Sequence, residues 1–564
     1  MWPSQVTLSA RPPMHLEIQQ HRANPVGVLR SSFRDAVDGK VRHTQHGRIT
    51  GVSLSILRNV QAALRDEVVP LADPAAFKII GSKEFGAPAA LLALAKDIGL
   101  DSALYSKPRQ PWVQDTLAMI AGRIIYQGSK LALTHQWKYS TLWELCGTAG
   151  PVDVDVHCYE AMDRLLERQP GIQKTLAKKH LTNGCLVLYD ITSSYFEGEY
   201  TNSELVQFGY DRDGKRGHEQ VVIGLLTSAD GCPVAVEVFP GNTQDAATVE
   251  GKVKELQEQY GIKELVFAGD RGMITASNEA KLSALPEHEG IKIISALTHR
   301  EIVDLLTRTN HAPELFDDRN IVEITDPGTP EHRYCLCRNP HSALRETTTR
   351  NELLERTRKE LDMIAGRKKP ALEAVIGARA GKILAKTKMG KYLLWSVNEG
   401  RLIWSVDEAA VEAAQALDGC YVIKTTVRAE AMDKDQVVAR YKSLGQVEQA
   451  FRNMKKVSLE MRPMHHKRDD RIRAHVFLCM LAYYLQWHLW ERLQPLFDEQ
   501  SQQISAGEKE PNERCWTLAN VLASLKSIQR NEVAVAGARF YTITTPDAEA
   551  QRILDLLKIN LPKL

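Results

Sequence analysis

The stretch CLVLYDITSSYF, residues 185–196, decides how this chain folds. It is a continuous apolar run that ends in an acid, Asp190, followed by hydroxyl side chains. An apolar run of this length is typical of a buried strand. A second apolar run, IKELVFAGDRGM at 262–273, ends in the same way at Asp270. Two buried strands that each end in an acid indicate an α/β sheet with a site at the carboxyl ends of its strands.

The segments between these runs predict how the strands connect. Residues 219–242 have the pattern of two strands around an Ala229-Asp230-Gly231 turn, and residues 245–261 have the pattern of a helix. The order is therefore strand, strand, strand, helix, strand. A crossover helix returns the fourth strand parallel to the first. If these two strands pair, Asp190 and Asp270 lie side by side.

A third acid lies on a predicted helix, YKSLGQVEQAFRNMK at 441–455. At 100° per residue, an apolar stripe on this helix is formed by Leu444, Val447, Phe451 and Met454. The flank beside the stripe carries Tyr441, Glu448, Arg452 and Lys455. Glu448 thus lies at the margin of a buried face. Two interpretations are open: an ordinary surface salt bridge to Arg452, or a position in a site shared with the two aspartates.

The order Asp190, Asp270, Glu448 favours metal-dependent chemistry on phosphate esters. Carboxylate oxygens are the ligands that hard divalent cations prefer. Two such ions about 3.5–4 Å apart activate a water and stabilise the leaving oxygen of a phosphodiester. Charge that develops on the phosphoryl oxygens would be offset by a nearby cation such as Arg452 or Lys455.

The composition sets wider bounds. A chain of 564 residues predicts two to four domains, and 43% hydrophobic with 25% charged residues is typical of a soluble globular protein. A net charge of +2 means that DNA would have to bind through local basic clusters. Nine cysteines without zinc-type spacing predict free thiols, and the adjacent His465 and His466 make a poor chelate.

No signal peptide or membrane span is expected. The N-terminus lacks an apolar segment, and the apolar run from Val476 is interrupted by Gln486 and His488. That run predicts a buried core helix, and we expect a cytoplasmic protein.

The sequence predicts six regions. They are a basic DNA-binding module at 1–70, a mostly helical region at 71–180, the first part of the core at 181–300, an inserted β-containing subdomain at 301–418, the second part of the core with the Glu448 helix at 419–495, and a C-terminal region at 496–564. Lys and Arg gather within 1–70, 367–391 and 452–473. Such clusters fit DNA phosphates, and they equally fit a solvated surface.

These motifs resemble the DDE transposases of bacterial insertion sequences, specifically the insertion-sequence-four group. That group has the signature Tyr, two residues, Arg, three residues, Glu, six residues, Lys. The chain matches it at Tyr441, Glu448 and Lys455 and departs from it at Leu444, where the signature has Arg. The contexts YDITSSYFEG, VFAGDRGM, FPGNTQD and MRPMHHKRDDRIRAHVFLCMLAYYL also look like the family, so the resemblance covers roughly residues 180–490.

The resemblance implies an RNase H-like core, a mixed α/β sheet flanked by helices. Its metal ligands would be Asp190, Asp270 and Glu448, which would hold two Mg²⁺ ions, with Mn²⁺ able to substitute. Its contacts to DNA phosphates would come from Tyr441, Arg452, Lys455 and Arg271. Our own hypothesis is that Arg452, on the flank of the site, supplies the cation missing at Leu444. Arg271 is another candidate, with an ordinary salt-bridge partner in a loop as the alternative for it.

The resemblance also implies partners and an activity. Family members bind the terminal inverted repeats of their element, cut the double-stranded DNA there and join the ends to target DNA, usually as homodimers in the bacterial cytoplasm. Two other functions stay open for the residues themselves. One is a two-metal nuclease of the same fold that does not join strands, and the other is a non-catalytic DNA-binding derivative of a transposase.

Overall fold

The structure is a computed structural model with two compact units. It describes residues 14–19, 25–35, 39–65, 77–210, 212, 217–285, 290–318, 320–367, 369, 371–457, 459–462, 464–506, 516–535 and 538–561. The first unit comprises Met1–Ser82 and Asn531–Thr542, and the second comprises Lys83–Arg530 and Ile543–Leu564.

The first unit begins with a three-stranded antiparallel sheet. Its strands are β1 (Met14–Gln19), β2 (Val26–Arg34) and β3 (Val41–Ile49), with β2 in the middle. Gly39, at φ 67°, donates its N–H to the carbonyl of Asp35 at 3.0 Å and closes the predicted turn between β2 and β3; Asp38 of that turn lies outside the described residues. The helix α1 (Leu54–Ala63) is capped by Ser53 and buries Leu57. A second sheet has the order β16 (Ala538–Ile543), β15 (Gln529–Val535), β4 (Phe77–Glu84).

Helices from both ends of the second unit pack together. Those before the sheet are α2 (Gly86–Asp97), α3 (Leu100–Leu104), α4 (Pro111–Ile125), α5 (Lys130–His135), α6 (Leu142–Leu145) and α7 (Ala161–His180). Those after it are α16 (Asp469–Ser505), α17 (Leu518–Lys526) and α18 (Ala548–Leu557). The apolar run from Val476 is the buried middle of α16, as predicted, and α16 packs against α4 and α7. Within the described part of the chain, none of the helices has the length and apolar character needed to cross a membrane.

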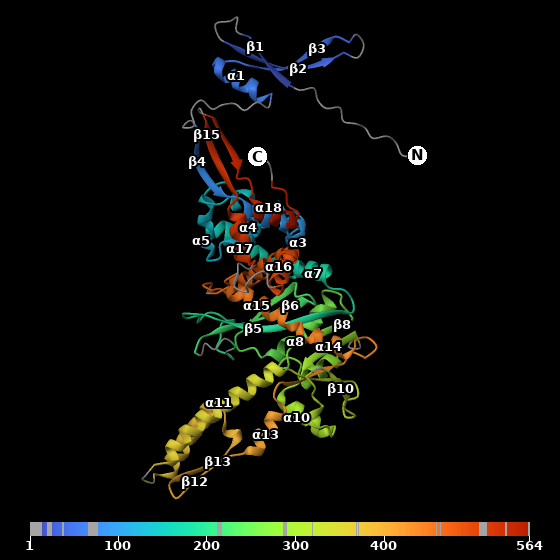
Figure 1. The fold of residues 1–564 in the computed structure, drawn as a ribbon, viewed down its shortest axis with the longest axis vertical. Coiled ribbons are helices and arrows are strands. Elements are labelled where there is room, and N and C mark those ends of the chain that lie inside the picture. Colours follow the sequence, from blue (N-terminus) through green and yellow to red (C-terminus); the bar gives the residue numbers. More distant parts are fainter. Residues whose placement is uncertain are drawn as a thin grey trace. The chain divides into compact units, whose positions relative to one another are not determined.

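The main sheet has eight strands in the order β10, β11, β14, β9, β8, β5, β6, β7. Figure 1 labels β5, β6, β8 and β10 of this sheet. Their bounds are β5 (Cys185–Tyr195), β6 (Gln220–Ser228), β7 (Pro233–Pro240), β8 (Leu265–Ala268), β9 (Ile291–Ala296), β10 (Val322–Thr325), β11 (Arg333–Arg338) and β14 (Cys420–Thr425). The strands β5, β8 and β9 run parallel, and every other neighbouring pair is antiparallel. The helix α8 (Asp245–Glu258) connects β7 to β8. The predicted strand order and the parallel pairing of its first and fourth strands are both observed.

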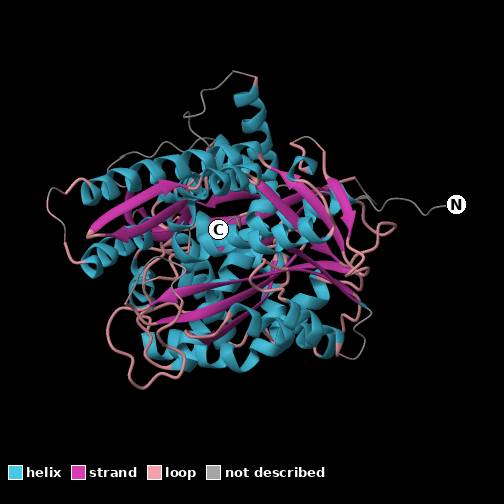
Figure 2. Cartoon of the chain, turned by 90° about the horizontal axis from the view of Figure 1, so that it is seen from below, coloured by secondary structure: helices cyan, strands magenta, loops and turns pink. Residues whose placement is uncertain are grey.

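Helices accompany this sheet, as Figure 2 shows by colour. They include α9 (Ala276–Ser283), α10 (His299–Arg308), α14 (Lys434–Lys442) and α15 (Leu444–Arg452). The buried side chains of β5, β6 and β8 belong to one core with those of α8, α15 and α16. The predicted fold class, a mixed α/β sheet flanked by helices, is therefore confirmed.

The segment predicted as one inserted subdomain, 301–418, divides into two parts in the structure. Its early strands β10 and β11 extend the main sheet. The remainder contains α11 (Pro340–Ala365), α12 (Glu373–Thr387), β12 (Leu393–Asn398), β13 (Arg401–Val406) and α13 (Glu408–Ala416). These elements have a core of their own, which includes Leu361, Ile376 and Leu402. At its base the N–H of Asn339 donates to the carbonyl of Gly419 at 2.9 Å.

Candidate active site

The two aspartates follow one another in strand register. Parallel pairing joins Leu188 of β5 to Ala268 of β8, so two residues further on Asp190 and Asp270 continue the same register. Asp270 follows the end of β8, as the sequence predicts. The prediction that Asp190 ends its strand is wrong, because β5 stays paired with β6 up to Tyr195.

One face of β5 collects polar side chains. Side chains alternate along a strand, so Asp190, Thr192 and Ser194 share a face. The Lys455 Nζ donates a hydrogen bond to Thr192 Oγ1, and the Arg462 Nε donates to Ser194 Oγ at 3.0 Å. The helix α15, which carries Glu448, packs against β5.

The opposite face of β5 is closed by the core. Tyr189 alternates with Asp190 and packs its ring against Phe267, with 5.8 Å between ring centroids. The charge of Glu255 on α8 acts on the Tyr189 hydroxyl and helps to raise its pKa, after burial as the main cause. Thr248 and Glu255 of α8 both act on this hydroxyl, so α8 lies on the Tyr189 side of β5.

The segment that carries Tyr441, Glu448 and Lys455 is interrupted twice. The helix α14 starts with a capping box between Asp433 and Gln436 and ends at Lys442, and α15 begins at Leu444. A π-helical turn, η7 (Asn453–Val457), follows and carries Lys455. The expectation of one straight helix over 441–455 is therefore wrong.

The apolar stripe of this segment is nevertheless as predicted. Its four members, Leu444, Val447, Phe451 and Met454, are all buried. Leu444 is 8% exposed and packs in the main core, so the position where the family signature has Arg belongs to the apolar stripe. Lys455 is also 8% exposed, because the π-helical turn places it against β5.

The acids influence one another electrostatically. The pKa of Asp190 is raised from 3.8 to about 6, mainly by burial and also by the negative charges of Asp270 and Glu448. The Ile191 N–H and the charge of Arg212 act in the opposite direction. The Tyr441 hydroxyl donates to Asp270 Oδ1 at 3.4 Å. Burial raises the pKa of Tyr441, and the charge of Asp270 adds to that effect. The structure thus brings all three predicted acids and Tyr441 to one place.

The donor set fits hard divalent cations. All three groups are carboxylates, the ligands that such cations prefer. Burial and the two neighbouring negative charges raise the pKa of Asp190, and a bound cation would offset the repulsion among the three carboxylates. The three carboxylates do not all lie within 4.8 Å of one another, the spacing found for a group that could hold one ion. A pair of ions about 3.5–4 Å apart spans a wider gap.

The remaining predicted residues lie at the rim. Arg452 is exposed, and no ion pair to Glu448 is found in the described structure, so the surface salt bridge considered for these two side chains is not observed. Arg271 is exposed beside Asp270, and its positive charge acts on Tyr441.

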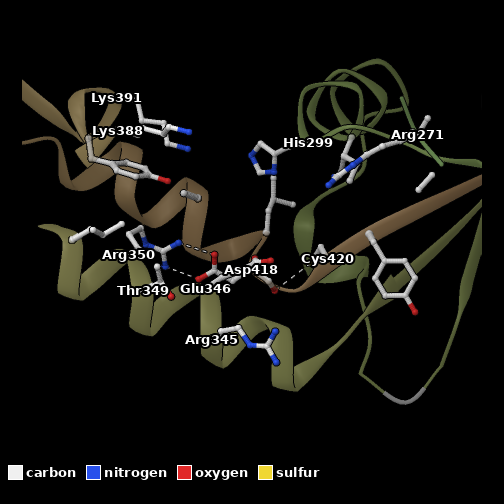
Figure 3. A pocket seen from close by; sticks show the side chains of 18 of the residues that line it. Arg271, His299, Arg345, Glu346, Thr349, Arg350, Lys388, Lys391, Asp418 and Cys420 are labelled. Carbon is white, nitrogen blue, oxygen red and sulfur yellow. Dashed lines mark hydrogen bonds and ion pairs between the residues drawn. The ribbon is translucent and has the colours of Figure 1, made fainter. Parts of the chain in front are cut away.

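A cavity of about 800 Å³ opens beside Asp270, the one of the three acids that lines it, and reaches the inserted elements (Figure 3). Asp270, Arg271 and Tyr441 line one part of it. Its further charged side chains are the basic Arg345, Arg350, Lys388 and Lys391 and the acidic Glu346 and Asp418. Arg350 donates to both carboxylate oxygens of Asp418, with its Nη1 2.7 Å from Oδ1, so its charge is matched within the protein.

Sequence reasoning missed three side chains next to the acids. On the Asp190 face of β5, the hydroxyls of Thr192 and Ser194 accept hydrogen bonds from the side chains of Lys455 and Arg462. Arg462 also donates to the Ser193 carbonyl. The signal for the hydroxyls was present, because strand alternation from Asp190 selects both of them. The signal for Arg462 was weaker, since it is one of many basic residues in 452–473.

Comparison with known proteins gives one family and one solved structure to report. Residues 183–485 match the family described as Transposase DDE domain. A piggyBac transposase chain, solved in a synaptic complex with hairpin DNA, is similar with 9% sequence identity and a TM-score of 0.34, over 78% of this chain and 79% of that chain. No curated protein sequence matches significantly.

Proposed function

The chain belongs to the family of transposases that share a DDE domain, and on this premise we propose that Asp190, Asp270 and Glu448 are its catalytic metal ligands. The proposed reaction is cleavage of DNA at the terminal inverted repeats of an insertion sequence, followed by joining of the ends to target DNA. Two Mg²⁺ ions, replaceable by Mn²⁺, would be held by the three carboxylates.

The observation that carries this proposal is the electrostatic crowding at Asp190. Its pKa is raised to about 6 by burial and by the charges of Asp270 and Glu448. Grouping anions around a buried carboxylate is unfavourable unless the group has a cationic partner or a functional role. A cation site explains why three acids from distant segments meet on one face of β5.

Each residue of the site has a proposed task. When bound, the two ions would activate a water and stabilise the leaving oxygen of a phosphodiester. Asp190 holds its position because β5 is paired on both sides, and Tyr441 orients the Asp270 carboxylate by its hydrogen bond. Lys455, fixed on Thr192, places a positive charge on the same face of β5 as Asp190.

The proposed DNA path runs from the acids along the cationic cavity. Arg271 lies beside Asp270, and Lys388 and Lys391 line the part contributed by the inserted elements. Phosphate contacts by Lys and Arg supply most sequence-independent DNA affinity. Arg452, exposed at the end of α15, would add a further contact.

Recognition of the element's ends is assigned to residues 1–70, the basic module of the sequence analysis. We further propose that the protein works as a homodimer on paired ends in the bacterial cytoplasm. These assignments rest on the family and on the charge of the segment, nine Lys or Arg against five acids.

The decisive test is the substitution Glu448→Gln. It preserves side-chain size and removes one anionic ligand, so we expect Mg²⁺-dependent cleavage of an end-containing duplex to fall on the order of a thousandfold. Binding to the same duplex should stay within about twofold, because phosphate contacts come from Lys and Arg. The matched control is Glu258→Gln, an exposed glutamate at the end of α8, on the side of the sheet away from Asp190.

The outcomes separate the open alternatives. Equal cleavage by Glu448→Gln and wild type would show that the exposed Glu448 takes no part in catalysis. Wild-type cleavage without any joining to target DNA would favour the nuclease. Specific binding without wild-type cleavage in Mg²⁺ or Mn²⁺ would favour the non-catalytic derivative.

A further inference from the structure

A second group of potential metal ligands lies away from the acids. His180 is the last residue of α7, Cys232 lies in the turn between β6 and β7, and His488 lies on α16. One ligand atom from each lies within 4.8 Å of the other two. In the described residues this is the group of three His, Cys, Asp or Glu side chains that is compact enough for one ion.

The two imidazoles are held in place by Tyr484. The His180 Nε2 and the Tyr484 hydroxyl are 2.9 Å apart, and the rings of His488 and Tyr484 meet edge to face with centroids 4.6 Å apart. The Nε2 atom of His488 is buried, and the described structure contains no hydrogen-bond partner for it. A buried ring nitrogen without a partner is costly, and a metal ion would satisfy it.

The turn that carries Cys232 is also fixed. Gly231 has φ 81°, a left-handed backbone conformation that favours glycine, and it lies next to Gln446 of α15. The Trp487 Nε1 donates to the Asp230 carbonyl at 3.3 Å. The cysteine is therefore held between α15 and the residue next to His488, on a turn that does not depend on the metal.

The ionisation of the three groups suits a soft ligand set. Burial lowers the pKa of His180 to about 4 and that of His488 to about 3, so both rings are neutral near pH 7 and each keeps a lone pair. Burial raises the pKa of the Cys232 thiol, which is therefore protonated until a metal displaces its proton.

Two neighbouring positive charges, those of Lys179 and Arg492, act on His488 and oppose cation binding, and Arg492 is ion-paired with Asp97. The Lys179 Nζ donates to the Tyr484 hydroxyl at 3.2 Å, within the same cluster of side chains. Lys179 is exposed, so water screens its charge, and a thiolate at Cys232 would compensate for it. The donor set consequently needs the deprotonated cysteine.

We propose that His180, Cys232 and His488 bind one transition-metal ion with the preferences of Zn²⁺. Two imidazole nitrogens and one thiolate are ligands that Zn²⁺ favours and Mg²⁺ does not, so this site is chemically distinct from the carboxylates. Binding forms one metal–sulfur and two metal–nitrogen bonds, and the thiol proton passes to the solvent. Three protein ligands leave a fourth position for water. The ion would link α7, the β6–β7 turn and α16 through their side chains. This site would lie close to α15, the helix that carries Glu448, because Gly231 of the turn lies next to Gln446 of α15.

The test is a titration of the full chain with Co²⁺ as the probe, in excess Mg²⁺ to occupy the carboxylates. We expect one equivalent to produce visible d–d bands and a near-ultraviolet thiolate-to-cobalt band, both removed by Zn²⁺. Cys232→Ser should abolish the thiolate band and weaken Co²⁺ binding by about tenfold or more. The matched control is Cys420→Ser, a partly buried cysteine at the start of β14, which should leave the titration unchanged.

Folding and function are kept apart in this design. Circular dichroism reports whether Cys232→Ser is folded, and His180→Gln, at the half-buried end of α7, provides a second variant that should also weaken Co²⁺ binding. The absorption readout does not depend on DNA cleavage. Absence of a thiolate band in the wild type, or an equal band in folded Cys232→Ser, would overturn the proposal.

Discussion

The substitution Asp190→Asn should stabilise the metal-free protein. The pKa of Asp190 is raised from 3.8 to about 6 by burial and by the charges of Asp270 and Glu448. A shift of about two pH units at ~1.4 kcal/mol each corresponds to ~3 kcal/mol by which the ionised carboxylate destabilises the folded state. The amide keeps an oxygen for the Ile191 N–H, which donates to Asp190 Oδ1 at 2.8 Å in the wild type.

The sign of the pH dependence follows from the direction of the shift. The folded pKa of Asp190 lies above its unfolded value, so the folded state binds more protons between about pH 4 and pH 6. Wild-type stability from this group is therefore lost as the pH rises through that window. The gain from Asp190→Asn should be absent near pH 4 and complete above about pH 7.

Hydrogen exchange of the β5 amides measures the effect, because it reports local opening in a chain of several cooperative parts. Wild type and variant are compared with EDTA at pH values across the window, and again with Mg²⁺ at pH 7.5. We expect Mg²⁺ to protect β5 in the wild type and to have little effect in the variant. The matched control is Asp304→Asn, an exposed aspartate on α10.

Two results would refute this reasoning. One is a loss of β5 protection in Asp190→Asn at pH 7.5 without metal. The other is a gain of the same size at pH 4 and at pH 7.5, since a pH-independent gain cannot come from an ionisable group.

Two further substitutions and one deletion test other parts of the proposal. Lys455→Met removes the charge that bonds to Thr192, and we expect cleavage in Mg²⁺ to fall at least tenfold while exposed Lys467→Met leaves it unchanged. Leu444→Ala should lower the free energy of unfolding by ~2–4 kcal/mol in a urea titration, because it opens a cavity in the main core; a loss below ~0.5 kcal/mol would indicate a surface site. Deletion of 1–70 should weaken the preference for the element's ends in a gel-shift assay, and an undiminished preference would rule out that assignment.

The backbone of the site could be predicted from the sequence because it depends on short-range patterns. Apolar runs ending near Asp190 and Asp270 marked β5 and β8, and the crossover helix between them required parallel pairing. The helical periodicity placed Leu444 in the apolar stripe, and this prediction was correct because burial along a helix follows local periodicity. The end of β5 was misjudged, since its extension depends on the partner strand β6.

Contacts between distant segments could not be predicted in this way. The breaks at Ser443 and at the π-helical turn leave no mark in the hydrophobic pattern, yet the turn is what brings Lys455 to Thr192. The cluster at Cys232 brings His180 and Cys232 to His488, which lies more than two hundred positions later in the chain. The sequence instead drew attention to the adjacent His465 and His466. Side-chain chemistry that depends on tertiary packing becomes visible only in three dimensions.

The hydrogen bond between Asn339 and Gly419 makes the elements from α11 to α13 a detachable module. Strand β11 pairs directly with β14 in antiparallel fashion, with Arg338 opposite Cys420. The residues between these two strands therefore form the connection of one β-hairpin. Loop-closure entropy rises by only about 0.6 kcal/mol for each doubling of length, so such a loop can grow or shrink at little thermodynamic cost. Evolution can therefore remodel or exchange this module without changing the register of the strands that hold the acids.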